Sequence, residues 1–307
     1  MIWKEYKAKK NVVISLAERY LEHKKEFGQD DGVKDDIFKK RLNNLKNDKF
    51  KIAVVGDVKA GKSTFINALL GQEILPVGTL QCTSAIIEIH KSDKISLKVV
   101  YGDGKSDEIF ISDPQELREK LDSIAKINDK DPNIPATLID SYILKDHDVN
   151  DILQSIPKLE EESGLKLENE KPLIEKYVTE RRKEDIVQEI SVGFPFEYEF
   201  EELTILDTPG MHAVGGLEEK TRNFLSEADA IMFVSYIKNI ENKWFKKFYD
   251  HIITDKKKEF LFLVLTHKGD VSNNELPNIF KTAKHIFEEL EPEKIIAVDS
   301  IFKIIWN

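Results

Sequence analysis

The segment Gly56–Ser63 constrains the fold of this chain more than any other part of the sequence. It reads G-D-V-K-A-G-K-S, which fits the pattern G-x-x-x-x-G-K-[ST]. The aliphatic run Lys51–Val55 precedes it and predicts a buried strand, whereas Phe65–Leu70 follows it and predicts a helix. A glycine-rich turn between a strand and a helix is the context that this phosphate-binding pattern requires, so a chance match in an ordinary turn is the weaker interpretation.

Aliphatic runs recur along the rest of the chain, separated by charged sequence of helical character. They occupy residues 203–206, 230–234, 260–265 and 295–298. Alternating strands and helices predict an α/β fold, here a P-loop domain with a mostly parallel central sheet covered by helices. Strand-like runs at 85–89, 95–101 and 108–111 precede a long polar stretch, which predicts a helical insertion at about residues 113–185.

Residues 1–48 predict a helical appendage before this domain. Apolar side chains recur every seven positions, at Tyr6, Val13, Tyr20 and Phe27. This spacing predicts one long amphipathic helix whose apolar stripe needs a partner. After a polar break at 29–32, the apolar spacing within 38–45 predicts a second helix that folds back on the first.

The residues of the glycine-rich turn have distinct expected roles around a nucleotide. Gly56 and Gly61 let the backbone approach phosphate oxygens, and the helix N-terminus adds its positive end. Lys62 is expected to reach the β and γ phosphates, and the Ser63 hydroxyl to bind Mg²⁺. The residues of this turn expected at the nucleotide are Gly56, Asp57, Ala60, Gly61, Lys62, Ser63 and Thr64.

Two downstream loops are candidates for nucleotide-dependent switches. Thr83 lies in a loop with proline and glycine and can complete the Mg²⁺ shell in the triphosphate state, with Ser84 and Thr79 as competing candidates. Asp207 ends a predicted strand in the run D-T-P-G and can hold the metal through water, while the amide of Gly210 contacts the γ-phosphate. An ordinary turn is the alternative interpretation of this run. The predicted metal-binding set is Ser63, Thr83 and Asp207.

A third loop, reading T-H-K-G-D, predicts the choice of base. The carboxylate of Asp270 can accept hydrogen bonds from N1 and the 2-amino group of guanine, whereas adenine lacks that pair of donors, so GTP and GDP are expected. Lys268 would lay its aliphatic stem along the base. His267 stands where Asn or Thr is expected, which leaves the bracing of this loop open. Ser300, after the last predicted strand, is expected to support the base through its amide, and ordinary surface charges are the alternative for Lys268 and Asp270.

Composition excludes several classes of protein. The net charge of −10 argues against a dedicated nucleic-acid binder. The single cysteine, Cys82, excludes an intramolecular disulfide and favours a reducing, cytoplasmic setting. The N-terminus is charged and no run approaches the roughly 20 apolar residues that span a bilayer, so any contact with a membrane is expected to be peripheral. Basic clusters at 181–183 and 256–258 lie among acids and predict solvated surface.

With these residues in place, two stretches resemble bacterial members of the dynamin-like GTPase superfamily. They are Gly56–Ser84, with G-D-V-K-A-G-K-S-T-F-I-N-A-L-L-G, and Asp207–Val234, with D-T-P-G-M-H and S-E-A-D-A-I-M-F-V. The resemblance covers about Lys51–Ser300 and implies a dynamin-type GTPase domain over residues 49–307. It also implies Mg²⁺-dependent GTP hydrolysis that is stimulated when two GTPase domains meet, linked to membrane remodelling or tethering. The N-terminal helices look like the family's segment that joins a helical bundle.

Some positions depart from the family pattern. Lys59 replaces a serine that often helps to order a monovalent cation, so it would supply positive charge directly or abolish the cation site. Met211 follows Gly210, so a water-positioning glutamine is absent and the backbone and Thr83 are expected to orient water. The expected catalytic set is Lys62, Thr83 and Lys59. The apolar end at 301–307 has no following bundle, which indicates a piece of a longer protein whose lipid-binding parts lie outside this chain.

Two other functions stay open at this stage. One is a GTP-dependent switch that binds a protein partner without mechanical work on membranes, and the other is a P-loop ATPase. A dimer-activated enzyme gains specific activity as its concentration rises, while a monomeric switch does not. Arg181, Arg182 and Arg222 are conceivable transition-state arginines, with solvated surface roles favoured for all three.

Overall fold

The structure is a computed structural model that describes residues 2–27, 35–57, 59–77, 86–128, 133–196, 202–208, 224–240, 260–287 and 290–299. The chain divides into two units. One comprises residues 1–50 with 197–204, and the other comprises residues 51–196 with 205–307. Within the described residues, none of the helices combines the length and the apolar character needed to cross a membrane.

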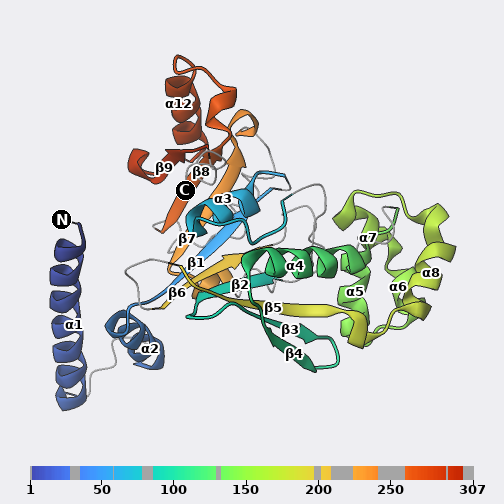
Figure 1. Ribbon diagram of the computed structural model, residues 1–307, viewed down its shortest axis with the longest axis horizontal. Helices are drawn as coiled ribbons and strands as arrows, with labels where there is room; N and C mark the ends of the chain where they lie inside the picture. Colours follow the sequence, from blue (N-terminus) through green and yellow to red (C-terminus); the bar gives the residue numbers. More distant parts are fainter. Residues whose placement is uncertain are drawn as a thin grey trace. The chain divides into compact units, whose positions relative to one another are not determined.

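The N-terminal unit contains two helices, α1 (Ile2–Phe27) and α2 (Asp35–Lys46) (Figure 1). They run antiparallel, because the rings of Tyr20 and Phe38 meet at a tilt of 51° with centroids 5.2 Å apart, while Lys10 near the start of α1 pairs with Asp48 at 2.6 Å. The predicted second helix therefore does fold back on the first. Val13 of the heptad stripe stays 51% exposed, so α2 covers only part of that stripe among the described residues.

A nine-stranded sheet forms the centre of the larger unit, in the order β4-β3-β5-β2-β6-β1-β7-β8-β9. The pairs β1–β7, β7–β8, β8–β9 and β2–β5 are parallel, and β3 runs antiparallel to both β4 and β5. The strands are β1 (Lys49–Gly56), β2 (Ile86–Lys91), β3 (Ser96–Tyr101), β4 (Ser106–Phe110), β5 (Val187–Phe194), β6 (Glu202–Asp207), β7 (Ala230–Tyr236), β8 (Leu261–Thr266) and β9 (Ile295–Ala297). The predicted α/β fold with a mostly parallel sheet is confirmed.

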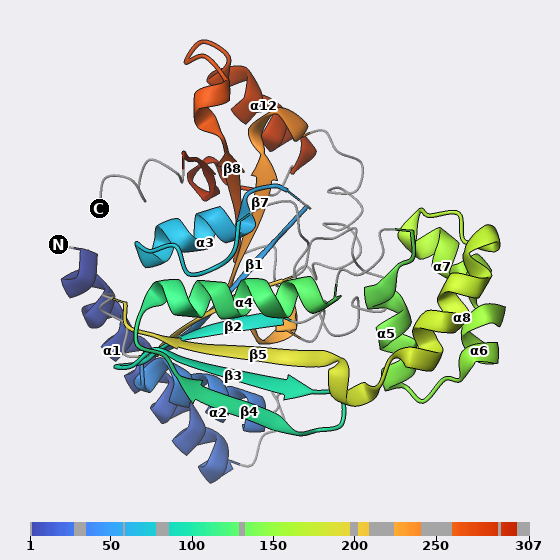
Figure 2. The ribbon, with the colours of Figure 1, turned by 45° about the vertical axis from the view of Figure 1, so that its right-hand side comes forward.

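Helices pack against this sheet and extend beyond it. The view in Figure 2 shows α4 lying along β2 and β5, as does Figure 1. The helices of this unit are α3 (Lys62–Leu70), α4 (Pro114–Asn128), α5 (Ala136–Leu144), α6 (Val149–Gln154), α7 (Ile156–Ser163), α8 (Lys171–Glu180) and α12 (Leu276–Ile286). Short 3₁₀ turns are η1 (Glu168–Glu170), η2 (Lys183–Asp185), η4 (Ile237–Asn239), η5 (Lys268–Asp270) and η6 (Pro292–Lys294).

Strand β5 is missing from the strands predicted from sequence, which include none between the end of the predicted helical insertion, at about residue 185, and the run at 203–206. Its signal is an apolar alternation at Ile190, Val192 and Phe194, each of which is buried. The strand lies between β2 and β3 in the sheet. The polar sequence before it led to a prediction of helix up to about residue 185. Local composition does not show that β5 pairs with a strand on each side, because both partners lie far away in the sequence.

The helices α5–α8 surround a core of their own. Its buried members are Ile134, Leu138, Ile139, Ile143, Ile152, Ile156, Leu159, Leu167, Ile174 and Ile186. The backbone of Gly102, in the β3–β4 turn, donates to the carbonyl oxygen of Ile186 at 2.8 Å and so joins this helical cluster to the sheet. From here on, the helical insertion means residues 133–186, a narrower range than the predicted 113–185, because α4 lies along the sheet (Figure 2).

Arg181 corrects one expectation. Its side chain is only 7% exposed, and it forms two hydrogen bonds to the carboxylate of Asp140, which is 3% exposed. The hydroxyl of Tyr177 donates to the same carboxylate at 2.9 Å. A solvated surface role for Arg181 is therefore wrong, because the charge is buried against a bidentate partner. Arg182 is exposed as expected, and Arg222 lies outside the described residues.

Candidate nucleotide-binding site

The glycine-rich turn begins where β1 pairs with β7. Gly56 has φ of +154° and lies opposite Val234, whose carbonyl oxygen would stand 2.1 Å from a β-carbon at position 56. Gly61 has φ of +87° and caps the N-terminus of α3 without a side-chain hydrogen bond. Gly61 has no side chain with which to cap the first amides of α3, and a phosphate can accept hydrogen bonds at such a helix N-terminus.

Lys62 lies inside the turn rather than on its surface. Its Nζ donates to the carbonyl oxygens of Gly56 at 3.1 Å and Asp57 at 2.8 Å. Burial lowers the pKa of this amine, and the charges of Asp207 and Asp57 oppose that effect. The ammonium group is thus held at the centre of the loop by groups that a phosphate oxygen can replace.

Asp207 ends β6 beside the turn, and Ser63 Oγ lies 3.4 Å from its Oδ2. The other oxygen, Oδ1, is buried and has no hydrogen-bond partner among the described residues. Burial raises the pKa of Asp207 to about 6, against the opposing effects of Lys62 and Ser63. A buried, unpaired carboxylate oxygen is costly, so this pair fits a hard cation that prefers oxygen ligands, as Mg²⁺ does.

Lys59 lies in the middle of the glycine-rich turn. Lys59 has φ of +59°, a left-handed conformation that is uncommon outside glycine, and its side chain is exposed. Ala60 is buried, while Asp57 and Thr64 are half-buried. Strained backbone in a phosphate loop is consistent with a functional constraint on this residue.

The bracing that the sequence left open at His267 comes from the residue before it. The buried Thr266 hydroxyl donates to the carbonyl oxygen of Ala60 at 2.7 Å, and the carbonyl oxygen of Ser235 lies 3.2 Å away. His267 Nδ1 is 3.0 Å from the same hydroxyl oxygen. Thr266 therefore ties the end of β8 to the phosphate loop. Sequence reasoning missed it because the motif position is the next residue.

Two further contacts hold residues 267–270, which we call the base loop. His267 has φ of +57°, and Lys268 and Asp270 follow it in η5 with exposed side chains. The amide of Gly269 donates to Asp299 Oδ1 at 3.1 Å, which places Asp299 in a supporting role that the sequence did not assign. The amide of Lys268 donates to the carbonyl oxygen of Val298 at 3.2 Å.

Several predicted site residues lie outside the described residues: Thr83 with its competitors Thr79 and Ser84, and Gly210, Met211 and Ser300. Next to two of these gaps, buried polar side chains fix the backbone. Thr208 Oγ1 donates to the carbonyl oxygen of Val54 at 2.9 Å, which anchors the loop after Asp207. Asn67 is fully buried and bonds the backbone of Ile74 and Leu75 through three hydrogen bonds, so it fixes the start of the loop that contains Thr83.

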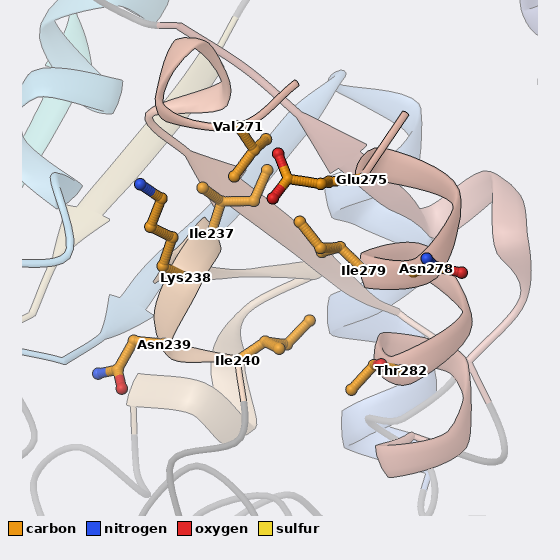
Figure 3. A pocket seen from close by; sticks show the side chains of 9 residues that line it. All are labelled: Ile237, Lys238, Asn239, Ile240, Val271, Glu275, Asn278, Ile279 and Thr282. Atoms are coloured by element: carbon orange, nitrogen blue, oxygen red, sulfur yellow. The ribbon is translucent and has the colours of Figure 1, made fainter. Parts of the chain in front are cut away.

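A separate pocket of about 880 Å³ lies between η4 and α12. In Figure 3, Ile237, Ile240 and Ile279 point toward one another across it, and Lys238 and Asn278 point away. Its lining residues are Ile237, Lys238, Asn239, Ile240, Val271, Glu275, Asn278, Ile279 and Thr282. None of these nine is among the residues predicted to bind the nucleotide.

Comparison with known proteins places the chain in a family. The family described as "Dynamin family" matches residues 52–268, well over half of the chain. Dynamin-like protein A of Bacillus subtilis (strain 168) is 27% identical over 225 residues, which cover 69% of this chain and 18% of that protein. An uncharacterized protein in the xynA 3′ region of Caldicellulosiruptor sp. (strain Rt8B.4) is 23% identical over 298 residues, which cover 91% of this chain and 56% of that protein.

The fold agrees with this placement. A solved structure described as an oligomerised bacterial dynamin pair superposes with a TM-score of 0.52 at 19% identity, covering 96% of this chain and 47% of that one. The chain spans only part of the length of the relatives it matches. It covers about half of the Caldicellulosiruptor protein, at 56%, and 18% of the Bacillus subtilis protein. The family match, the glycine-rich phosphate loop and the sheet around it show that this chain belongs to the dynamin family of GTPases.

Proposed function

We propose that this protein binds GTP together with Mg²⁺ at the phosphate loop and that hydrolysis depends on the metal. The observation that carries this proposal is the buried Oδ1 of Asp207, which lacks a partner among the described residues and lies beside Ser63. Ser63 and Asp207 would hold the ion, directly and through water respectively. When bound, Mg²⁺ neutralises charge on the β and γ phosphates.

Lys62 supplies the fixed positive charge of the site. Its Nζ donates to two carbonyl oxygens of the loop, and phosphate oxygens would take their place as acceptors. The amides at the start of α3, which lack a side-chain cap, add donors along the same direction. Thr83 and Gly210 complete this proposal from their sequence positions, as the residues that respond to the γ-phosphate.

Lys59 is proposed as a catalytic charge in place of a monovalent cation. Its left-handed backbone and exposed side chain in the middle of the turn support this role. The wild type should then hydrolyse GTP at the same rate in sodium, potassium and choline salts. The variant Lys59→Ser should lose turnover, and a cation requirement in the wild type would contradict the proposal.

Guanine recognition is assigned to Asp270, with Lys268 along the base and Ser300 at its edge. Support comes from the three attachments that hold the base loop, through Thr266, Val298 and Asp299. A rigid loop keeps the carboxylate where it can accept two hydrogen bonds from one edge of guanine, and this selects GTP over ATP.

Stimulation by pairing of GTPase domains, and work on membranes, are proposed from family membership. The solved structure that superposes on this chain belongs to a bacterial dynamin pair, for which long-range sensing and tethering of membranes are described. This chain shares the fold of that protein. We infer that the GTPase domains of two copies of this chain associate when nucleotide is bound, and that the assembled protein acts at a membrane.

Calorimetric titration with GTP and ATP, with and without Mg²⁺, tests binding. Asp270→Asn should weaken GTP binding and favour XTP, while the exposed control Asp103→Asn should leave both unchanged. Phosphate release is then followed over a wide range of protein concentrations. Specific activity that rises with concentration supports domain pairing, whereas flat activity favours a monomeric switch that binds a protein partner. Equal binding of ATP and GTP would overturn the assignment of Asp270.

A further inference from the structure

Tyr236 is the last residue of β7, and its side chain contacts the base loop at two points. The phenol hydroxyl donates to Asp270 Oδ2 at 2.8 Å. The ring meets the His267 imidazole edge-on, with centroids 5.1 Å apart and planes at 90°. The register of the sheet sets this arrangement, because Tyr236 pairs with Thr266 on the neighbouring strand β8.

The two contacts restrict the rotation of the Tyr236 ring and the direction of its hydroxyl group. The edge-to-face contact with His267 is a favourable aromatic geometry and limits rotation of the ring. The phenol is protonated at neutral pH because its ordinary pKa is about 10, and the hydrogen bond to Asp270 raises that pKa further. The side chain is half-buried, while the carboxylate that it contacts is exposed.

An exposed aspartate without such an anchor samples several rotamers, and binding a base would then cost the entropy of fixing one of them. An ionised carboxylate offers about four acceptor positions, so one bond from the phenol leaves room for the two donors of guanine. The phenol bond holds one oxygen of the carboxylate and so narrows the orientations that the group samples.

We propose that Tyr236 is a positioning residue for guanine recognition, whose hydroxyl holds the Asp270 carboxylate in the orientation that accepts both N1–H and the 2-amino group. This inference rests on the proposed function, because Asp270 is the residue proposed to recognise the base. Tyr236 touches no phosphate-loop residue in the hydrogen bonds above, so its effect belongs to base affinity rather than to hydrolysis.

The test compares Tyr236→Phe with the wild type by calorimetry with GTP, ITP and ATP. The variant keeps the ring and its contact with His267 and removes only the hydroxyl. GTP should bind about three- to tenfold more weakly, which is the range that corresponds to the net contribution of a typical hydrogen bond. ITP lacks the 2-amino group and depends on one bond to the carboxylate, so it should lose less. The KM for GTP should rise while kcat at saturation stays unchanged.

Tyr6→Phe is the matched control, since it removes a tyrosine-to-aspartate hydrogen bond, to Asp48 at 3.1 Å, in the N-terminal unit. It should leave all three affinities unchanged. In an Asp270→Ala background, adding Tyr236→Phe should cause no further loss of GTP binding, because the phenol then has no carboxylate to hold.

A GTP affinity within about twofold of the wild type, or an equal loss in the Asp270→Ala background, would overturn the inference. So would an unchanged ratio of GTP to ITP affinity. That ratio stays informative even if the variant is partly unfolded, because the folded fraction scales both affinities equally. If the wild type binds no guanine nucleotide, the proposed function fails, which is a separate outcome from a wild type that binds GTP regardless of Tyr236.

Discussion

The hydroxyl of Thr266 donates to the carbonyl oxygen of Ala60 at 2.7 Å, across 206 positions of sequence. This bond joins the base loop to the phosphate loop and supplies the bracing that the sequence left open at His267. The two loops that are proposed to bind the nucleotide are therefore joined by a buried hydroxyl.

Replacing this hydroxyl should damage stability and nucleotide binding together. Thr266→Val keeps the shape of the side chain but leaves the carbonyl oxygen of Ala60 buried without its donor, which should cost about 1–3 kcal/mol of unfolding free energy. GDP and GTP should weaken to the same degree, since both contact both loops. Thr266→Ser is the control and should lose less than half as much in urea denaturation. A valine variant as stable as the wild type would show that the bond is not needed.

The pKa of Asp207 predicts how stability depends on pH in EDTA without nucleotide. The folded protein holds this proton to a pKa of about 6, against an ordinary value of 3.8. Because the folded state binds the proton more tightly than the unfolded chain, stability is highest below the unfolded pKa and falls as pH rises to the folded pKa. A shift of this size corresponds to on the order of 3 kcal/mol.

The variant Asp207→Asn carries no such proton and should remove this loss. Its unfolding free energy, measured in urea at steps from about pH 4 to pH 7, should gain on that of the wild type as the pH rises. Parallel curves for the two proteins would contradict the shifted pKa.

Gly56 predicts a steric limit on the phosphate loop. Alanine there would place a β-carbon 2.1 Å from the carbonyl oxygen of Val234 at a positive φ, so β7 must move. The expected cost is about 3 kcal/mol or more, from overpacking and backbone strain together. Gly104→Ala is the matched control, because its φ of +83° carries strain but nothing lies within 4 Å of the added carbon. It should cost about 1–2 kcal/mol, and equal losses at the two positions would remove the steric argument.

The buried pair of Arg181 and Asp140 predicts strong coupling within the helical insertion. Arg181→Met leaves a buried carboxylate without its cation and should cost about 3–5 kcal/mol. Adding Asp140→Leu should recover most of that loss, since an apolar replacement of both partners removes the uncompensated charge. Hydrogen exchange should place the loosening of the single variant in residues 133–186. Additive effects of the two substitutions would indicate that the pair does not interact.

Local features of the sequence were enough to predict the fold class. The glycine pattern at 56–63 and the aliphatic runs on either side predicted β1, the turn and α3, because backbone freedom and hydrophobic periodicity act over a few residues. The same reasoning placed Asp207 and Asp270 at strand ends. In the structure, Asp207 ends β6 and Asp270 follows β8 by a few residues.

Side-chain partners depended on the tertiary structure. Tyr236, Thr266 and Asp299 support the base loop from three different segments, and the sequence predicted a role for none of them. From sequence alone Arg181 was predicted to be a surface charge, but in the fold it is buried against Asp140. Strand β5 was not predicted, because its place between β2 and β3 depends on pairing with distant segments. By itself the sequence determined the chemistry that the loops carry, because that chemistry follows from residue type and local geometry. Only the tertiary structure decided which groups hold those loops in place, because such contacts join residues far apart in the chain.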